Sequence, residues 1–343
     1  MQQPEGYEDP DKPNHVCKLK KSIYGLKQAP YLWTQLLGKT LKRYGYQQLL
    51  TDTSCFIKTD NSGTAAILAC YVDDILILAR TDEIMQQVKA DLRAEFIVKE
   101  LGQVSWILGI AAERNLEDRT FVLHQRKYIN DMVVKYGQEN SKGRDLPYSG
   151  GDEKPLESVP CTHQEINTFR SLVGSLLYCA VATRVDIVET VSRLCRSMQA
   201  PTKSDLQKAI RCLQYLKGTA DLGLTYSGED GFRVYCDSNW AGQAEQRRSR
   251  TGYAIMLNNA AIIMRSLIQK SQALSTAEAE YVALCAAAQD ACFLLEMLQE
   301  MGMPLTEPIV IYEDNQACIA IATKNMASAR LKHIDIRYQL SFC

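Results

Sequence analysis

Histidine is scarce in this sequence, and its cysteines do not form metal-binding pairs. The 343 residues include four histidines, and the twelve cysteines stand singly, with no C-x-x-C spacing. Structural zinc sites are commonly built from such pairs, so no zinc site is expected. The chain opens on the polar stretch MQQPEGYEDPDKPNH, which does not have the pattern of a secretory signal. A disulfide framework is therefore not expected either, and we predict a reducing, intracellular setting.

A strong net charge and a long hydrophobic run are missing as well. The net charge is −1 at pH 7, which excludes a general attraction to nucleic acid. Two local basic clusters could still neutralise phosphates, although either could equally be a solvated charged face. These clusters are Lys18, Lys20, Lys21 and Lys27, and Arg247, Arg248 and Arg250. The longest apolar stretch, Ala65 to Ala79, is interrupted by two aspartates, so no membrane partner is expected.

The sequence does contain enough apolar material for packed domains. Hydrophobic residues make up 46% of the chain, and its length suggests two or three units. The mixture of helix and strand patterns predicts a multi-domain α/β (α+β) fold. We place the boundaries at residues 1–145, 146–228 and 229–343. Residues 145–161 are rich in glycine, proline, serine and acidic residues, which is typical of a linker.

Hydrophobic periodicity predicts the elements within these parts. A helix is expected over residues 22–46, because apolar residues recur there at helical spacing: Leu32, Trp33, Leu36, Leu37 and Leu41. A hairpin over 65–80 and an amphipathic helix over 81–96 should follow. Residues 164–217 have a helical pattern, and 227–231 a turn pattern. The remainder predicts three strands, a long helix, a strand and a helix, which suggests antiparallel strands followed by a crossover.

Two adjacent aspartates interrupt the predicted hairpin. Asp73 and Asp74 lie between two runs of apolar residues. Carboxylates in an apolar setting are costly unless a partner neutralises them, and Mg²⁺ does so with one or two carboxylates plus substrate phosphates. Neighbouring strand residues point to opposite faces, so both can serve one site only at the bend of the hairpin. The alternative is a plain turn with two solvent-exposed acids.

Three further acids occupy a strand, a helix and a strand end. Asp237 alternates with Val234 and Cys236 in a predicted strand, which places it on the opposite face. Glu280 lies about one turn into the long helix, whose start is indicated by a capping box of Ser275 and Glu278. Gly302 is a stop signal for that helix. Asp314 ends the short strand that comes next.

Each of the three acids also has an alternative that involves no chemistry. Asp237 could be a surface strand residue, and Glu280 could be a first-turn acid favoured by the helix dipole. Asp314 could be the N-cap of the next helix. The order of the acids along the chain does not decide between these alternatives and a shared site.

Several strings resemble copia-type retrotransposon Pol polyproteins. YVDD at the bend of the hairpin resembles the catalytic turn of reverse transcriptases, and KLKKSIYGLKQAPYLW resembles the copia-type segment beside the incoming nucleotide. ELGQVSWILGI resembles the element that holds the primer end. The resemblance implies that Asp73 and Asp74 are catalytic metal ligands. It also implies that the nucleotide is bound near Tyr24, Gly25, Lys27 and Gln28.

The second half of the chain resembles the connecting region and RNase H of the same family. FRSLVGSLLYCAVATRVDI and CLQYLKGTADLGLTY resemble the connection, with Val185 where the family usually has proline. YCDSNWAG, STAEAEY and EDNQA resemble the nuclease, which implies that Asp237, Glu280 and Asp314 are catalytic metal ligands. Two Mg²⁺ or Mn²⁺ ions roughly 4 Å apart can then activate water and stabilise the leaving oxygen, and hard cations prefer carboxylate ligands.

The resemblance implies a reverse transcriptase palm and thumb, a helical connection and an RNase H-like mixed sheet, the first and last of them partial. The implied partners are an RNA template, a DNA primer, an RNA–DNA hybrid and a dNTP, in a cytoplasmic virus-like particle or the nucleus. By this resemblance a third polymerase aspartate precedes the QPEGY segment and a fourth nuclease carboxylate follows KHIDIRYQLSFC. We therefore expect weak binding of a hybrid and no primer extension. The alternative is a non-catalytic nucleic-acid-binding remnant or a host-adopted protein.

Overall fold

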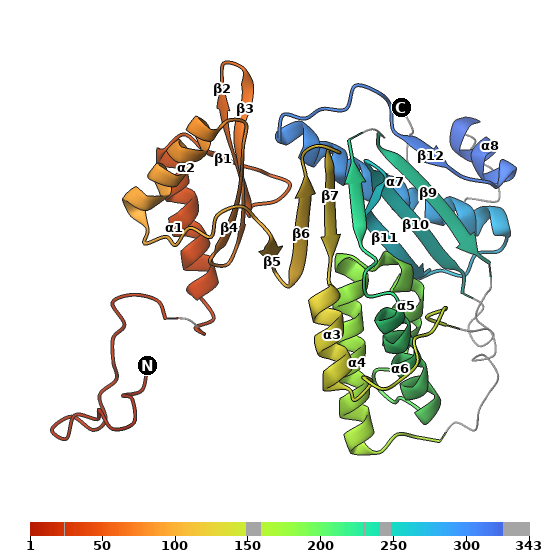
Figure 1. Ribbon diagram of the computed structural model, residues 1–343, viewed down its shortest axis with the longest axis horizontal. Helices are drawn as coiled ribbons and strands as arrows, with labels where there is room; N and C mark the ends of the chain where they lie inside the picture. Colours follow the sequence, from red (N-terminus) through yellow and green to blue (C-terminus); the bar gives the residue numbers. More distant parts are fainter. Residues whose placement is uncertain (24, 149–158, 229–230, 241–247, 325–343) are drawn as a thin grey trace. The chain divides into compact units, whose positions relative to one another are not determined.

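The computed structural model describes residues 1–343 except 24, 149–158, 229–230, 241–247 and 325–343. The chain forms two compact units, and each is described by itself (Figure 1). The first unit comprises Met1–Leu101 together with Leu294–Leu305. The second comprises Gly102–Phe293 and the residues from Thr306 onward.

The first unit is a sheet of antiparallel strands in the order β1-β2-β3-β4, with two helices. Its elements are α1 (Ala29–Arg43), β1 (Gln47–Gln48), β2 (Cys55–Asp60), β3 (Gly63–Tyr71), β4 (Asp74–Ala79) and α2 (Asp82–Glu95). The hairpin predicted over 65–80 is confirmed as β3 and β4. The helix predicted over 81–96 is confirmed as α2, whose N-cap Thr81 accepts a hydrogen bond from the Ile84 amide at 3.3 Å.

The predicted helix over 22–46 is shorter in the structure. It begins only at Ala29, because Pro30 suits the first helical turn, where a missing N–H costs no hydrogen bond. Leu37 and Leu41 are buried, whereas Leu32 and Leu36 are exposed. The apolar spacing was therefore a sound guide to the helix but not to its buried face. The core of this unit joins α1, α2 and the sheet through Leu41, Phe56, Leu68 and Val88, among others.

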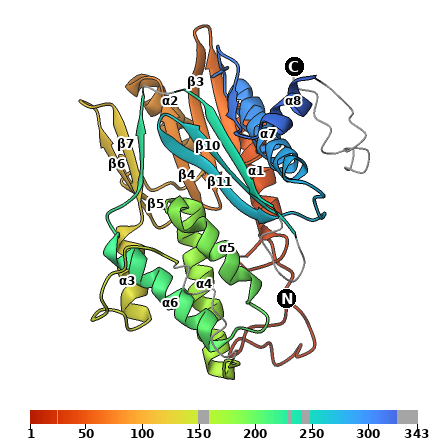
Figure 2. The same ribbon diagram turned by 90° about the vertical axis from the view of Figure 1, so that its right-hand side faces the viewer.

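In its described residues, the second unit contains a group of helices and two further sheets. Its first elements are β5 (Trp106–Ile107), β6 (Ile110–Asn115), β7 (Thr120–His124), α3 (Arg126–Lys135), α4 (His163–Ala182), a 3₁₀ turn (Val185–Ile187), α5 (Val188–Arg196), α6 (Lys203–Gly218) and β8 (Leu224–Ser227). β5 to β8 form one antiparallel sheet in sequence order. Figure 2 shows α3 to α6 gathered beside one another, and they share a buried apolar core. The predicted helical character of 164–217 is confirmed.

A buried arginine ties the end of α4 to α6. Arg184 is 1% exposed and forms a bidentate ion pair with Asp186, at 3.0 and 2.7 Å. The same guanidinium donates to the Thr219 carbonyl at 2.9 Å, and the Tyr215 hydroxyl donates to Asp186 at 2.7 Å. Because the buried charge is fully paired, this network is structural, and removal of one partner would leave an unpaired charge.

The remaining elements form a mixed sheet with a long crossover helix. They are β9 (Arg233–Asn239), β10 (Arg250–Leu257), β11 (Ala260–Ile268), α7 (Thr276–Glu300), β12 (Val310–Tyr312) and α8 (Gln316–Lys324). The strand order is β11-β10-β9-β12, with β9, β10 and β11 antiparallel and β12 parallel to β9. This confirms the predicted antiparallel strands followed by a crossover, and the whole chain is a mixed α/β protein.

The predicted boundaries at 145 and 228 stay predictions, because a compact unit is not the same thing as a functional domain. The predicted linker over 145–161 lies largely outside the described residues, as do residues 229 and 230 of the predicted turn over 227–231, in which Gly228 is a turn residue. α7 ends at Glu300, and Gly302 follows in a left-handed conformation with φ +74°, as its role as a stop signal predicts.

One helix of the described residues, α7, has the length and apolar composition of a membrane span. Half of its apolar window is buried inside the protein, and the core helix of a water-soluble domain has the same features. The absence of a membrane partner stays a prediction.

The cysteines of the described part of the chain form no disulfide bonds. Cys17 and Cys292 are exposed, whereas the other described cysteines are buried or half-buried. Burial raises the pKa of the Cys179 thiol to about 12, and it also raises the pKa of Cys212 and Cys236. These buried thiols are therefore unreactive at neutral pH.

Candidate functional site

The two adjacent aspartates lie at a tight hairpin turn in the first unit. Tyr71 pairs with Asp74 at the open ends of β3 and β4, so that Val72 and Asp73 alone make the bend. All four side chains are exposed. Val72 has φ 55°, a left-handed conformation that is costly for a β-branched residue. Asp73 thus lies in the bend and Asp74 begins β4 directly after it, so both acids are at the turn end of the hairpin, although their exposure also fits a plain turn.

A tryptophan from α1 supports this strained turn. The Trp33 indole N–H donates to the Val72 carbonyl at 2.5 Å, and its ring packs edge-on against Phe96 at 5.4 Å between centroids. The bond joins residues 39 positions apart in sequence, so it depends on the fold. Trp33 therefore acts as a positioning residue for the turn that carries Asp73 and Asp74.

The candidate nucleotide-binding residues precede α1. Gly25 has φ +92°, a conformation that favours glycine, and a methyl group added there would meet no atom within 4 Å. Lys27 and Gln28 are exposed, and Gln28 is the residue before the first turn of α1. Tyr24 lies outside the described residues. The backbone at Gly25 is therefore open to a ligand, and the role of these residues in nucleotide binding stays a prediction.

Three acids of the second unit converge on one point. Asp237 comes from β9, Glu280 from the first turns of α7, and Asp314 from just after β12. One carboxylate oxygen from each lies within 4.8 Å of the others, close enough to share a cation. Glu280 is buried, whereas Asp237 and Asp314 are exposed. The structure thus brings together residues that the sequence order only suggested would meet.

Local signals place each of these acids. In β9, Val234 and Cys236 are buried and Asp237 is exposed, which confirms the predicted alternation. The Ser275 hydroxyl accepts from the Glu278 amide at 3.2 Å, as predicted for the start of α7. The Glu278 carboxylate accepts from the Leu274 amide at 2.7 Å.

The alternative in which Asp314 is the N-cap of α8 is wrong. Asn315 is the cap, because its side-chain oxygen accepts from the Ala317 and Cys318 amides at 3.0 Å each. Asp314, one residue earlier, is left to face the other acids.

Glu280 is buried among other acids, and its carboxylate is not fully hydrogen-bonded. One of its oxygens, Oε2, is buried without a hydrogen-bond partner in the described structure. Burial, followed by the charge of Glu313, raises the pKa of Glu280 to about 7. Asp237 and Asp314 raise it further, whereas the neighbouring Ser238 lowers it. A carboxylate in this state is not the solvated first-turn acid of the simpler alternative, and a bound cation would relieve its repulsion.

Two features near this cluster were missed in the sequence. Glu313 lies beside Asp314 and accepts hydrogen bonds from the Cys236 thiol at 3.3 Å and from the Asn315 amide at 3.0 Å. Its position in the string EDNQA was the available signal. Tyr235 and Tyr312 stack in register with ring centroids 4.8 Å apart, and both are exposed. No sequence pattern indicated that pair, because the two strands meet only in the folded sheet.

The two predicted basic clusters differ in exposure and in ion pairing. Lys18, Lys20, Lys21 and Lys27 are exposed. Arg250 is largely buried and pairs with Glu189 at 3.3 Å, so it is not available for phosphate binding as predicted. Arg248 is half-buried and next to a cavity, whereas Arg247 lies outside the described residues.

Known proteins are similar to this chain over most of its length. Residues 1–149 match the family model described as reverse transcriptase (RNA-dependent DNA polymerase). The chain is 36% identical, over 98% of its length, to the retrovirus-related Pol polyprotein from transposon TNT 1-94 of Nicotiana tabacum, and it spans 26% of that protein. It is 34% identical, again over 98% of its length, to the corresponding polyprotein from transposon RE1 of Arabidopsis thaliana, of which it spans 23%.

A third relative is much closer to this chain in extent. The transposon Ty5-1 protein of Saccharomyces cerevisiae is 31% identical, and the match covers 82% of this chain and 92% of that protein. The chain thus spans about a quarter of the two plant polyproteins and nearly all of the yeast protein. From these matches and the YVDD turn, the chain belongs to the copia-type retrotransposon Pol polyproteins and carries a reverse transcriptase domain.

Proposed function

We propose that this chain acts on RNA–DNA hybrids through two acidic centres, as an RNA-directed DNA polymerase and a metal-dependent ribonuclease H. The observation that supports the nuclease most directly is the convergence of Asp237, Glu280 and Asp314 within 4.8 Å. Three acids at such a distance repel one another, so an arrangement of this kind is costly unless a cation binds there.

The residues fit a divalent cation of the hard class. All three offer carboxylate oxygens, which Mg²⁺ and Mn²⁺ prefer, and the unpaired Glu280 Oε2 gives a buried oxygen in need of a partner. Asp237, Glu280 and Asp314 would hold such a cation, which would supply Lewis-acid charge for phosphodiester hydrolysis. The exposure of Asp237 and Asp314 leaves one side of the cluster open to a nucleic-acid strand.

At the polymerase centre, the exposed turn presents Asp73 and Asp74 to a triphosphate and its metal ions. Gly25, Lys27 and Gln28 would contact the nucleotide, with the open backbone at Gly25 allowing close approach. Two carboxylates are few ligands for a metal pair, and electrostatic clamping of the triphosphate is most of the catalysis. The expectation of no primer extension therefore stays a prediction, and we propose that any extension by this chain is weak at most.

Hybrid cleavage tests the proposed nuclease. Purified chain should cleave the RNA strand of a labelled RNA–DNA hybrid with Mg²⁺ or Mn²⁺, and chelator should stop it. Glu280→Gln should reduce cleavage by about 100-fold or more, because metal charge stabilisation is worth several kcal/mol. The matched control is Glu296→Gln, an exposed acid further along the same helix, which should cleave normally. Equal loss in both variants would refute the assignment of Glu280.

The second candidate function is binding of nucleic acid without catalysis. It is favoured by the exposed Lys18, Lys20, Lys21 and Lys27, which can contact phosphates without any metal. Hybrid binding with no cleavage or extension in Mg²⁺ or Mn²⁺, and no change on Glu280→Gln, would support it over the enzyme.

A further inference from the structure

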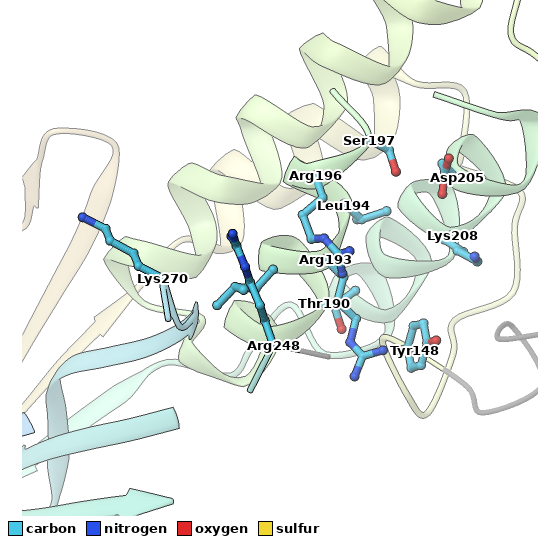
Figure 3. Close-up of a pocket in the computed structure, with 11 residues that line it drawn as sticks. Tyr148, Thr190, Arg193, Leu194, Arg196, Ser197, Asp205, Lys208, Arg248 and Lys270 are labelled. Atoms are coloured by element: carbon cyan, nitrogen blue, oxygen red, sulfur yellow. The ribbon is translucent and has the colours of Figure 1, made fainter. Parts of the chain in front are cut away.

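A polar cavity of about 630 Å³ lies in the second unit, away from the residues already discussed as metal ligands (Figure 3). Its walls come from α5, α6 and the residues flanking β10 and β11. Figure 3 shows Arg193 and Lys208 on neighbouring helices, with Arg248 and Lys270 on the side of the sheet. Tyr148, Thr190 and Ser197 add hydroxyl groups to the lining.

Positive charge in this cavity exceeds negative charge. Five of the lining residues are arginine or lysine, and one, Asp205, is acidic. Asp205 is already engaged as part of a capping box, accepting from the Thr202 amide at 2.9 Å and from its hydroxyl at 2.8 Å. Among the described residues, no ion pair is formed by Lys208, Arg248 or Lys270. Their charges therefore lack a partner within the described fold.

The positive charge around the cavity also affects the pKa of the nearby Arg250. Burial, the largest cause, lowers the pKa of Arg250, and Glu189 at 3.3 Å only partly offsets this. The positive charges of Arg193 and Arg196 lower it further. Glu189 also accepts from Arg193 at 2.7 Å, so one carboxylate serves two guanidinium groups. An added anion would be stabilised in such a field.

Strand register places the cavity at the same end of the sheet as Asp237. Asp237 pairs with Gly252, whereas Arg250 pairs with both Asn239 and Ile268. Arg248 and Lys270 each lie two residues beyond that last row. Arg248 lies four positions before Gly252 and two before the start of β10, a span of at most roughly 13 Å at about 3.3 Å per extended residue. Phosphates follow one another at about 3.4 Å of axial rise in a strand, so the cavity and the acids are a few nucleotides apart.

We propose that this cavity binds backbone phosphates of the nucleic-acid strand whose cleavage site lies at the acidic cluster. This inference rests on the proposed nucleic-acid substrate. Arginine presents a planar fork of donors that matches phosphate, and lysine adds point charge. The hydroxyl groups of the lining supply further donors. The cavity thus fixes the register of the strand and reads no bases.

The test measures hybrid binding without catalysis. Fluorescence anisotropy of a labelled RNA–DNA hybrid is recorded in chelator, at several salt concentrations between about 50 and 200 mM. The variant is Arg248→Gln with Lys270→Gln. The control is Arg114→Gln with Lys142→Gln, which removes the same charge from exposed positions elsewhere in this unit.

The cavity variant should bind about tenfold more weakly at low salt, and the slope of log affinity against log salt should fall by roughly 1.4–1.8, as for two lost phosphate contacts. The control should change much less. Arg248→Lys with Lys270→Arg, which keeps both charges, should retain most of the affinity. Equal weakening in the cavity variant and the control would overturn the proposal.

A second arm separates backbone phosphate from a free anion. Inorganic phosphate is titrated at constant ionic strength against the wild-type chain and the cavity variant. Weak competition with the hybrid that disappears in the variant is the expected result. If phosphate binds the cavity while hybrid affinity is unchanged in the variant, the cavity is a small-anion site and the proposal is wrong. Both binding assays are run in chelator and do not depend on metal. Failure of the nuclease assignment would therefore leave these binding results unaffected.

Discussion

The Asp73–Asp74 pair and the Asp237–Glu280–Asp314 cluster differ in how many helices and strands must form before the acids come together. The first pair is adjacent in sequence, and a two-residue bend between β3 and β4 is enough to present both acids. The second set is assembled from a strand, a helix and a strand end. A local turn can therefore carry one acidic centre, whereas the other exists only when a mixed sheet and its crossover helix are formed.

The two centres also store their unfavourable energy in different places. At the turn, the strain is in the backbone, because Val72 has φ 55° and Trp33 secures its carbonyl. In the cluster, the strain is electrostatic, since Glu280 is buried among other acids. Strain at a functional site is tolerated when the surrounding structure determines it. Mutations at the two centres should therefore differ in their signatures.

The largest expected effect separates the two centres by activity. Asp237→Asn should reduce hybrid cleavage by about 100-fold or more and leave any primer extension unchanged. Asp73→Asn should reduce any primer extension and leave hybrid cleavage unchanged. Both activities are measured on the same preparations, with Mg²⁺ and with chelator. A single substitution that removes both activities would show that the centres are not independent.

The electrostatic strain of the cluster predicts that Glu280→Gln is more stable than wild type at high pH but not at low pH. Because the folded state raises the pKa of Glu280 from 4.5 to about 7, it holds that proton more tightly than the unfolded chain. Stability is therefore lost as pH rises through this interval. Without metal, Glu280→Gln should be more stable than wild type by up to about 3 kcal/mol near pH 8. Near pH 4 the two should be alike.

Chemical denaturation of the metal-free protein at both pH values measures this difference. Glu296→Gln is again the matched control and should show no such pH dependence. A constant difference between Glu280→Gln and wild type at both pH values would mean that burial of the carboxylate is not the cause.

Two tryptophans allow a matched comparison of how each centre is supported. Trp33 donates to the Val72 carbonyl in the first unit, and Trp240 donates to the Ala273 carbonyl at 3.1 Å in the second. Replacement of either by phenylalanine keeps an aromatic ring and removes one hydrogen bond, worth about 1 kcal/mol. Trp33→Phe should speed amide hydrogen exchange at residues 71–74 and leave cleavage intact. Trp240→Phe should lower cleavage and leave that exchange unchanged.

The smallest expected effect tests the backbone strain. Val72→Gly removes the side chain that makes a left-handed conformation costly, at the expense of a more flexible unfolded chain. A net gain of about 0.5–1 kcal/mol in unfolding free energy is expected, measured by denaturation. Val98→Gly, at an exposed position outside helices and strands, is the control and should not stabilise. A loss of stability in Val72→Gly would show that the turn is not strained.

The sequence was informative where a signal is local. The apolar runs around Asp73 and Asp74 were enough to predict the hairpin, and Ser275 was enough to place Glu280 near the start of α7. The start of α1 was predicted too early, since apolar spacing continued ahead of Pro30. Asp314 and Asn315 can both cap a helix, and only the folded chain shows that Asn315 does so. The Trp33–Val72 bond and the cavity depend on tertiary contacts that no local pattern reveals.

The distribution of thiols has a practical consequence. Of the described cysteines, Cys17 and Cys292 are the exposed ones, and they belong to different units. The buried thiols react slowly, because burial raises the pKa of residues such as Cys179. With Cys343, which lies outside the described residues, replaced by serine, a thiol-specific spin label should therefore attach preferentially at these two positions. The distance between the labels, recorded with and without hybrid, would act as a molecular ruler for the movement of one unit relative to the other.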